Sequence, residues 1–342
     1  MRAVQLREFG PPEVLHQVEL PDPVPGPDEV VVRVDACSVC YHDLLDRSGK
    51  LPGVTLPLVP GHEIAGRVAQ TGANVTDLAE GEPVVIYHRI SCGHCRSCLA
   101  GRPDLCRDGS LVGSDRDGGY AEYVTVPRRV LLRVPDGVPP EKAALAVCPI
   151  ATSIRAVVGV ANVSFGDLVL VTGASGGLGL HQMQLAKLRG ANVIAVTSSP
   201  DKADTLRRYG ADEVVVSPDL KFGAEVWRLS GKRGVNVVLE NVVNATFAES
   251  IRAMAPAGRM VVLGNLDMRP VEVNPGLLIA RRLTISGSGN PLYSEVEQAL
   301  GLIASGRIEP VVGARFIFPE AAKAHAAVEA RKVTGRALLA GW

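Results

Sequence analysis

The chain has 342 residues, of which 46% are hydrophobic and 21% charged, and its formal net charge is zero. This length predicts two domains, and the composition is ordinary for a globular protein. The balanced charge argues against nucleic acid or an anionic membrane as a partner, and no uninterrupted apolar run reaches the roughly 18 residues of a membrane span.

The first 150 residues predict a β-rich and irregular domain. The N-terminus enters a strand-like alternation at once, with no apolar signal segment, so we expect a cytoplasmic protein with reduced thiols. Residues 30–35 alternate with the period of a half-buried strand. Shorter strands are predicted at 84–86 and 120–126.

Four cysteines form the pattern C-x2-C-x2-C-x7-C, at Cys92, Cys95, Cys98 and Cys106. The segment around them contains glycine and has no apolar periodicity, which indicates a loop organised by a metal. Four thiolates suit tetrahedral Zn²⁺. In a chain that is not secreted, such spacing favours a zinc site over disulfides or unliganded thiols.

After residue 162 the pattern changes to short buried strands separated by helix-length segments. Continuous apolar runs occur at 168–172, 193–196, 214–216, 235–239, 260–263 and 283–285. Such runs are typical of strands buried on both faces, and their alternation with helices predicts an α/β fold. Six strands match the doubly wound parallel sheet of a Rossmann domain, which binds a dinucleotide.

The first of these strands runs into a glycine-rich turn, Gly173-Ala174-Ser175-Gly176-Gly177-Leu178-Gly179. In the fingerprint G-x-G-x-x-G, Ala174 occupies the first glycine position, and Gly176 and Gly179 occupy the second and third. The turn follows a buried strand and opens a helix. We therefore predict that residues 174–179 bind the cofactor pyrophosphate.

The tip of the second strand predicts NADP(H) rather than NAD(H). NAD sites place an acid about 20 residues after the turn, whereas this chain has Thr197, Ser198 and Ser199. Their hydroxyls and Lys202 are suited to a 2′-phosphate, which a carboxylate would repel. Asp201 lies beyond a proline, and we expect it to cap the next helix rather than turn inward.

The cysteine pattern and the glycine-rich turn resemble those of the zinc-containing medium-chain dehydrogenases/reductases, the alcohol dehydrogenase superfamily. The resemblance runs over the whole chain. It implies a GroES-like catalytic domain of residues 1–150 and 290–342, with a structural zinc lobe at about 91–107. It also implies a Rossmann domain of residues 151–289, a small-molecule substrate, and a homodimer or homotetramer.

The resemblance further implies a catalytic zinc, and so two Zn²⁺ per chain. The family's ligands correspond to Cys40, His62 and Cys148. Two thiolates and one imidazole leave an open coordination position, which suits a zinc ion that acts on a substrate oxygen. Glu63 is either a transient fourth ligand or a supporting group, and Asp43 occupies the place of a carboxylate that orients the site. Of the seven cysteines, only Cys37 has no place in either ligand set, and it is expected in the core.

Three more positions take their expected roles from the family. Thr152 corresponds to a residue facing the nicotinamide, and Arg336 to one that reaches the cofactor phosphates; a solvent-exposed charge is the alternative for Arg336. Alcohol-oxidising members have a hydroxyl residue where this chain has His42, and a histidine where it has Leu45. The usual proton relay is therefore interrupted. Either His42 exchanges the proton itself, or the enzyme does different chemistry.

These features predict a zinc-dependent oxidoreductase that transfers hydride between NADP(H) and an alcohol or carbonyl compound. The alternative is an ene-reductase of an activated C=C such as acryloyl-CoA. Residues 40–45, 171–179 and 263–265 resemble the acryloyl-CoA reductase branch, and conjugate reduction does not need the alcohol relay. A zinc-stabilised sensor without activity is disfavoured, because the catalytic ligand set is intact.

Overall fold

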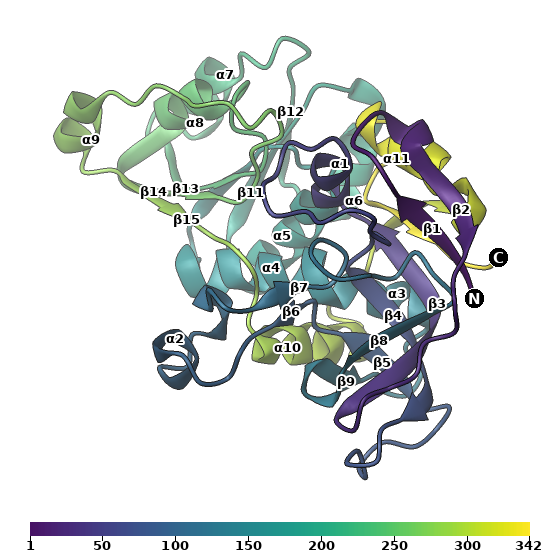
Figure 1. Ribbon diagram of the computed structural model, residues 1–342. Coiled ribbons are helices and arrows are strands. Elements are labelled where there is room, and N and C mark those ends of the chain that lie inside the picture. The colour runs from purple at the N-terminus through teal and green to yellow at the C-terminus, as the bar shows by residue number, and fades with distance from the viewer. The chain divides into compact units, whose positions relative to one another are not determined.

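The computed structural model describes all residues from 1 to 342. The chain divides into two compact units. The first comprises Met1–Ala151 and Asn290–Trp342, and the second comprises Thr152–Gly289. In Figure 1 the first unit runs from purple to blue-green and returns in yellow at the C-terminus, whereas the second is teal to green.

The first unit is built on an irregular β-structure. Its strands are β1 (Arg2–Leu6), β2 (Leu15–Glu19), β3 (Glu29–Val39), β4 (Glu63–Thr71), β5 (Pro83–Ile86), β6 (Arg89–Ile90), β7 (Ser110–Leu111), β8 (Tyr123–Pro127), β9 (Leu131–Arg133), β16 (Val312–Phe316) and β17 (Arg336–Leu339). A seven-stranded sheet has the order β16-β17-β3-β4-β5-β9, with β8 paired to β3. The pairs β1–β2 and β6–β7 are separate.

The register of this sheet brings distant segments together. β3 pairs with β4 so that Ser38 lies opposite Glu63, and β17 pairs with β3 so that Ala337 lies opposite Val39. The residues just beyond these pairs, Cys40, His62 and Arg336, therefore meet at one end of the sheet. Because β17 is the last element of the chain, this meeting place depends on the C-terminal segment.

The helices of the first unit are α1 (Tyr41–Arg47), α2 (Arg96–Leu99), α3 (Pro140–Leu145), α10 (Tyr293–Ala304) and α11 (Ala321–Glu329). After α3 the chain forms a π-helical turn, Ala146–Ile150, then α4 (Ala151–Ile154) and a second π-helical turn, Arg155–Val160. Pro149 lies in the first of these turns and has no N–H for the usual helical hydrogen bond, which accounts for the local widening.

The helical stretch Pro140–Val160 is long and apolar enough to cross a membrane by length and composition. In its most apolar window 67% is buried inside the protein, as for a core helix.

The second unit is the predicted doubly wound α/β domain. Its strands are β10 (Leu168–Val171), β11 (Asn192–Thr197), β12 (Glu213–Val216), β13 (Val235–Glu240), β14 (Met254–Val262) and β15 (Thr284–Gly287). All are parallel, in the order β12-β11-β10-β13-β14-β15. The strand order reverses between β10 and β13, which is where such sheets bind their ligands. The prediction of a six-stranded Rossmann sheet is confirmed.

Helices α5 (Gly177–Leu188), α6 (Ala203–Arg208), α7 (Gly223–Leu229), α8 (Phe247–Ala253) and α9 (Pro275–Arg281) complete this unit. One cluster of its core joins apolar side chains of the strands, among them Leu170, Ile194 and Val238, to Phe222 and Phe247 at the helix starts. Burial of this surface on folding is the main force that holds the sheet and helices together.

One predicted strand is shorter than expected. Residues 120–126 alternate as a strand, but β8 begins only at Tyr123. The N–H of Tyr120 donates to the carbonyl of Pro60, and that of Glu122 to the carbonyl of Arg2, so the segment's first residues pair elsewhere.

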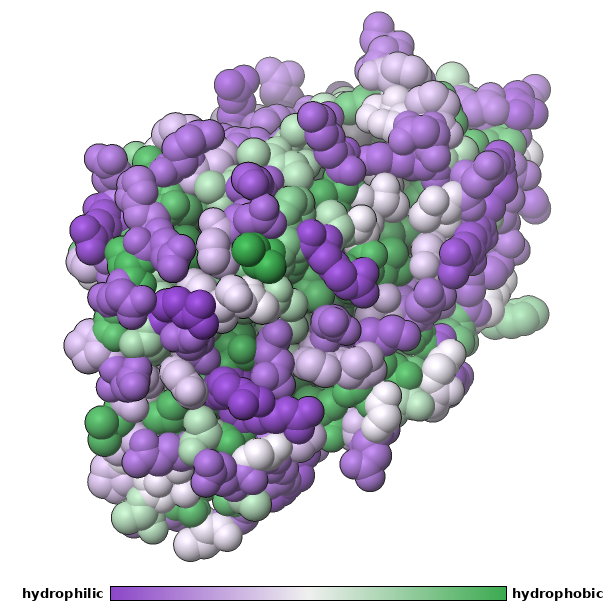
Figure 2. Space-filling model, turned by 90° about the vertical axis from the view of Figure 1, so that its right-hand side faces the viewer, coloured by the Kyte–Doolittle hydropathy of each residue, from purple (hydrophilic) through white to green (hydrophobic).

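The face drawn in Figure 2 mixes many polar residues with smaller apolar groups, as is usual for a protein surface in contact with water.

Candidate functional site

The four-cysteine loop has the geometry of a structural zinc site. The Sγ–Sγ distances are 3.6 Å for Cys95–Cys98, 3.9 Å for Cys92–Cys98 and 3.9 Å for Cys95–Cys106. A tetrahedron with Zn–S bonds of about 2.3 Å has edges of about 3.8 Å. The sulfur atoms thus surround a space of the right size for zinc.

Backbone groups favour the thiolate form in this loop. The N–H of Cys95 points at the sulfur of Cys92, and the N–H of Cys92 at the sulfur of Cys106, each at 3.3 Å. Hydrogen bonds from the backbone N–H groups of His94 and Cys95 lower the pKa of Cys92. A hydrogen bond from the N–H of Cys92 likewise lowers the pKa of Cys106. Zinc binds thiolates, so the loop is prepared for the ion. None of the seven cysteines forms a disulfide.

A second set of metal-ligating groups lies where β3, β4 and the π-helical turn meet. The ligand atoms of Cys40, His62, Glu63 and Cys148 all lie within 4.8 Å of one another. Cys40 is the N-cap of α1, His62 precedes β4, and Cys148 lies in the π-helical turn. Three segments that together span more than 100 residues of sequence thus present two thiols, an imidazole and a carboxylate to one point, which fits an open zinc site.

Asp43 orients two members of this set. Its Oδ1 atom lies 2.8 Å from Nδ1 of His62, and its Oδ2 atom accepts the N–H of Cys40 at 2.8 Å. With Nδ1 engaged by the carboxylate, Nε2 of His62 is the nitrogen left for a metal. The same carboxylate caps the first turn of α1, so helix start and ligand orientation depend on one side chain.

Arg336 lies in this cluster and is buried. Its Nη2 atom donates to Oε1 of Glu63 at 2.6 Å and lies 3.4 Å from Sγ of Cys40. The alternative of a solvent-exposed charge is therefore wrong; a contact with cofactor phosphates stays a prediction. A hydrogen bond with Cys148, followed by the charge of Arg336, lowers the pKa of Cys40.

Glu63 is held by protein groups on both oxygens. Arg336 donates to Oε1, and the hydroxyl of Ser38 donates to Oε2. Burial raises the pKa of Glu63 to about 7, although the charge of Arg336 opposes the shift. Of the two roles left open for Glu63, this arrangement favours that of a supporting group.

His42 lies next to the ligand histidine and has partners that the sequence did not reveal. The two imidazole rings are edge to face, with centroids 5.6 Å apart. Nε2 of His42 lies 3.4 Å from both Oδ2 of Asp46 and Oγ of Ser114, and Ser114 donates to Asp46 at 2.6 Å. Burial raises the pKa of Asp46. The i,i+4 spacing of His42 and Asp46 on α1 was the available signal.

His88 is a further histidine at this end of the first unit, and no sequence pattern pointed to it. Its ring centroid lies 5.4 Å from that of His62, and its Nε2 atom lies 3.3 Å from Oδ1 of Asn290. Burial lowers the pKa of His88 to about 3, so the ring is neutral at physiological pH. The ring of His62 thus lies beside the rings of both His42 and His88.

In the second unit, the glycine-rich turn has the close packing that the fingerprint requires. A Cβ atom on Gly179 would lie 2.5 Å from Cα of Ala174, so only glycine lets α5 approach the strand end. A Cβ on Gly176 would meet only the carbonyl oxygen of Gly173, at 3.3 Å. Gly176 is the N-cap of the twelve-residue helix α5, whose free N–H groups suit a phosphate.

A buried polar network that the sequence did not predict joins this turn to the neighbouring strand. Glu240, at the end of β13, accepts hydrogen bonds from Thr172, Thr246, Ser250 and the N–H groups of residues 242 and 243. The amides of Asn241 and Gln182 bond each other. Because Thr172 directly precedes the turn, the network fixes the two strand ends at the point where the strand order reverses.

The tip of β11 carries the hydroxyl residues predicted to select the cofactor. Thr197 is buried and bonds the backbone of Ser199, while Ser198 and Ser199 are partly exposed. Lys202 is only 9% exposed. Asp201 lies inside the short 3-10 helix Pro200–Lys202, and α6 has no side-chain cap, so the expected capping by Asp201 is wrong.

Thr152, which is predicted to face the nicotinamide, is a buried residue of α4.

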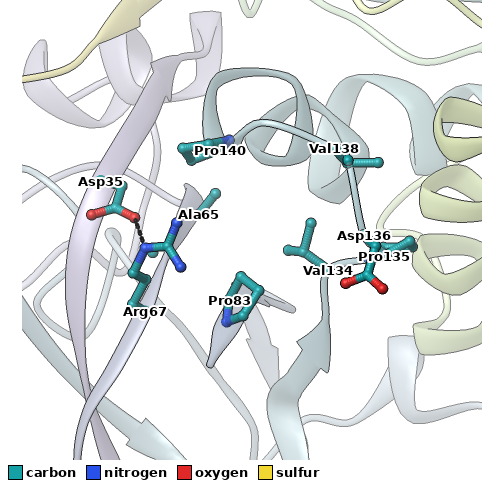
Figure 3. Close-up of a pocket in the computed structure, with 11 residues that line it drawn as sticks. Asp35, Ala65, Arg67, Pro83, Val134, Pro135, Asp136, Val138 and Pro140 are labelled. Atoms are coloured by element: carbon teal, nitrogen blue, oxygen red, sulfur yellow. Dashed lines mark ion pairs between the residues drawn. The ribbon is translucent and has the colours of Figure 1, made fainter. Parts of the chain in front are cut away.

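Figure 3 shows a small pocket elsewhere in the first unit. It has a volume of about 160 Å³, and prolines and valines make up five of its eleven lining residues. Of its three charged lining residues, Asp35 and Arg67 form an ion pair at 3.3 Å, and the third is Asp136. None of the predicted zinc ligands lines it, and we assign it no role in the reaction.

Known proteins resemble this chain over most of its length. The family model of the alcohol dehydrogenase GroES-like domain matches residues 26–136, and that of zinc-binding dehydrogenases matches residues 177–305. The acryloyl-coenzyme A reductase of Sulfurisphaera tokodaii is 35% identical over 304 residues, covering 89% of each chain. The NAD-dependent alcohol dehydrogenase of Saccharolobus solfataricus is 31% identical and covers 99% of each chain.

The fold is also found among solved structures. The crystal structure of AibC superposes with a TM-score of 0.93 at 42% sequence identity, covering 100% of this chain and 96% of that chain. Both parts of the chain therefore have close counterparts, and they occur there in the same order.

Proposed function

Because the chain belongs to the zinc-containing medium-chain dehydrogenase/reductase family, we propose that it is an NADP(H)-dependent enzyme with two zinc ions per chain that interconverts an alcohol and a carbonyl compound. The convergence of Cys40, His62 and Cys148 within 4.8 Å carries this proposal. When bound, zinc supplies a Lewis acid for the substrate oxygen, and the nicotinamide supplies or accepts hydride.

Side chains of the protein orient the zinc ligands, transfer the proton and bind the cofactor. Asp43 fixes the ring of His62, and Arg336 holds Glu63 beside the ligands. We assign the proton step to His42, whose Nε2 atom faces Asp46 and Ser114 and so has a route by which a proton can leave. Residues 174–179 bind the cofactor pyrophosphate, and Thr152 faces the nicotinamide.

A second candidate is supported by a specific observation. His42 and Leu45 interrupt the alcohol relay, and the Sulfurisphaera tokodaii relative, 35% identical, is named an acryloyl-coenzyme A reductase. An ene-reductase would add hydride to the β-carbon of an activated C=C and a proton to the α-carbon, a reaction that does not need the alcohol relay.

A substrate panel separates the two candidates. NADPH oxidation is followed by absorbance with a series of aldehydes and, in parallel, with acryloyl- and crotonyl-CoA. We expect the enzyme to reduce aldehydes with NADPH and to oxidise the corresponding alcohols with NADP⁺. Turnover of the enoyl thioesters alone would replace the first candidate by the second.

Replacement of His42 by alanine tests the proton step. General acid–base assistance is worth at least about 100-fold in rate, so we expect kcat to fall by that factor and the pH–rate profile to flatten. If His42 only lines the pocket, KM changes while kcat and its pH dependence remain. A full kcat would refute the proton role and strengthen the ene-reductase candidate.

Cofactor preference tests the tip of β11. A charge-assisted phosphate contact contributes about 1.5–3 kcal/mol, so we expect NADPH to bind at least about tenfold more tightly than NADH. Lys202→Ala should weaken NADPH and leave NADH nearly unchanged. Arg207→Ala, at an exposed position of the next helix α6, is the matched control. Equal dissociation constants for both cofactors in the native enzyme would contradict the assignment.

We also propose a cytoplasmic homodimer or homotetramer. The cytoplasmic location is supported by two thiolate sites, which require reduced cysteines, and by the lack of any disulfide. Light scattering on the purified protein measures the oligomeric state directly.

A further inference from the structure

A buried chain of polar side chains leads from the ligand His62 to helix α11, which lies more than 250 residues further along the sequence. Nδ1 of His62 contacts Oδ1 of Asp43 at 2.8 Å. The hydroxyl of Tyr120 lies 3.5 Å from Oδ2 of Asp43 and 2.9 Å from Nε2 of His325. Asp43, Tyr120 and His325 have no exposed surface, so no water competes for these contacts.

The direction of these hydrogen bonds follows from His325. Its Nδ1 atom is buried and has no partner. A buried N–H without an acceptor costs about 1–3 kcal/mol, so the proton of the neutral ring belongs on Nε2. Nε2–H then donates to the oxygen of Tyr120, which leaves the hydroxyl proton of Tyr120 for Oδ2 of Asp43. Burial lowers the pKa of His325 to about 4, which keeps the ring neutral.

Tyr120 is also fixed against the backbone that carries His62. Gly61, the residue before that ligand, has φ of +95°, and a Cβ atom on it would lie 2.4 Å from the ring of Tyr120. The N–H of Tyr120 donates to the carbonyl of Pro60 at 3.0 Å, and that of Gly119 to the carbonyl of Gly61 at 2.8 Å. The ring thus covers the turn before His62, while its hydroxyl reaches the carboxylate that orients the imidazole.

We propose that Tyr120 and His325 are positioning residues for the catalytic zinc: they hold Asp43 in the orientation in which it fixes His62. This inference rests on the proposed catalytic zinc at Cys40, His62 and Cys148. It gives α11 a function in the metal site, because that helix contributes the last member of the chain. Neither residue forms a hydrogen bond with a metal ligand atom, so their effect passes through Asp43.

Zinc release from the whole protein tests the inference. Loss of a group that orients a ligand weakens metal binding by about 10–100-fold, so we expect Tyr120→Phe to release one of two zinc ions to a chromogenic chelator about tenfold faster than the native protein. The other zinc, bound by the four-cysteine loop, should leave at the native rate. In the Co²⁺-substituted protein, the same variant should alter the visible absorption spectrum of the Cys40 site.

A pair of variants at His325 separates positioning from packing. The side-chain amide of His325→Gln can donate from nearly the same place as Nε2–H, whereas His325→Leu cannot. We expect near-native zinc release for His325→Gln and fast release for His325→Leu, even where Tyr120→Phe fails to fold. Phe222→Leu, in the core of the second unit, is the control for stability loss alone and should keep both zinc ions.

Two results would overturn the inference while leaving the proposed function intact. The first is native release rates in both Tyr120→Phe and His325→Leu. The second is equally fast release from His325→Gln and His325→Leu, which would show that only packing matters. A native protein that holds a single zinc would instead refute the catalytic zinc itself, and the inference with it.

Discussion

Replacing Cys148 with serine is expected to leave a folded protein that contains one zinc ion per chain and has lost its activity. Cys148 supplies one of only three ligand side chains besides Glu63, and all four ligand atoms lie within 4.8 Å of one another. Serine fills nearly the same volume but is not a thiolate. Lewis-acid catalysis contributes several kcal/mol, so we expect kcat/KM to fall by about a thousandfold or more.

Metal analysis and calorimetry measure the two parts of this expectation. Zinc content should fall from two ions per chain to one, while the melting temperature stays close to the native value. Cys37→Ala is the matched control, because Cys37 is a buried cysteine in β3 that is not among the ligands. Full turnover by Cys148→Ser, or a native protein with one zinc, would remove Cys148 from the catalytic site.

The parts of the fold with local sequence signals could be predicted from the sequence. Six short, mainly apolar runs predicted six strands, and the observed sheet contains all six. The edge strands β12 and β15 are less buried than the runs suggested, because each has a neighbouring strand on one side only. The four-cysteine loop is equally local, because its ligands lie within 15 residues of one another. Periodicity and spacing report structure of this kind because the interactions responsible involve neighbours along the chain.

The proposed catalytic cluster could not be predicted from spacing, and the sequence indicated it only through family resemblance. Its contacts depend on sheet register: Ser38 opposite Glu63, and Ala337 opposite Val39. A shift of one residue would turn these side chains to the other face. Register is set by packing over the whole sheet, which explains why Arg336 was expected either at the cofactor or in solvent.

The supporting residues were missed for a different reason. Tyr120 and His325 are of residue types that are common both on surfaces and in cores, so composition does not distinguish a buried polar chain from ordinary exposure. Their role becomes visible only when Tyr120 is seen against Gly61 and within reach of Asp43. Asp46 and Ser114 meet at His42 in the same way, from segments 68 residues apart.

The four-cysteine loop is expected to unfold locally when Cys95 is replaced by serine. The loop has little apolar surface to hold it without the ion, since Leu99 is 77% exposed and Leu105 55% exposed. The guanidinium of Arg89, which bonds the carbonyls of Pro103 and Cys106, is its main other anchor. Zinc binding therefore contributes most of the free energy that orders residues 91–107.

We expect Cys95→Ser to contain one zinc ion per chain, to melt several degrees below the native protein, and to be cleaved by protease within residues 91–107. A loss of about 2 kcal/mol corresponds to roughly 4–8 °C for a domain of this size. Ser97→Ala, in the same loop but without a ligand atom, should keep both zinc ions and the native melting temperature. If Cys95→Ser resists protease and retains two zinc ions, the four-cysteine loop does not depend on a metal, and its thiolates must serve some other purpose.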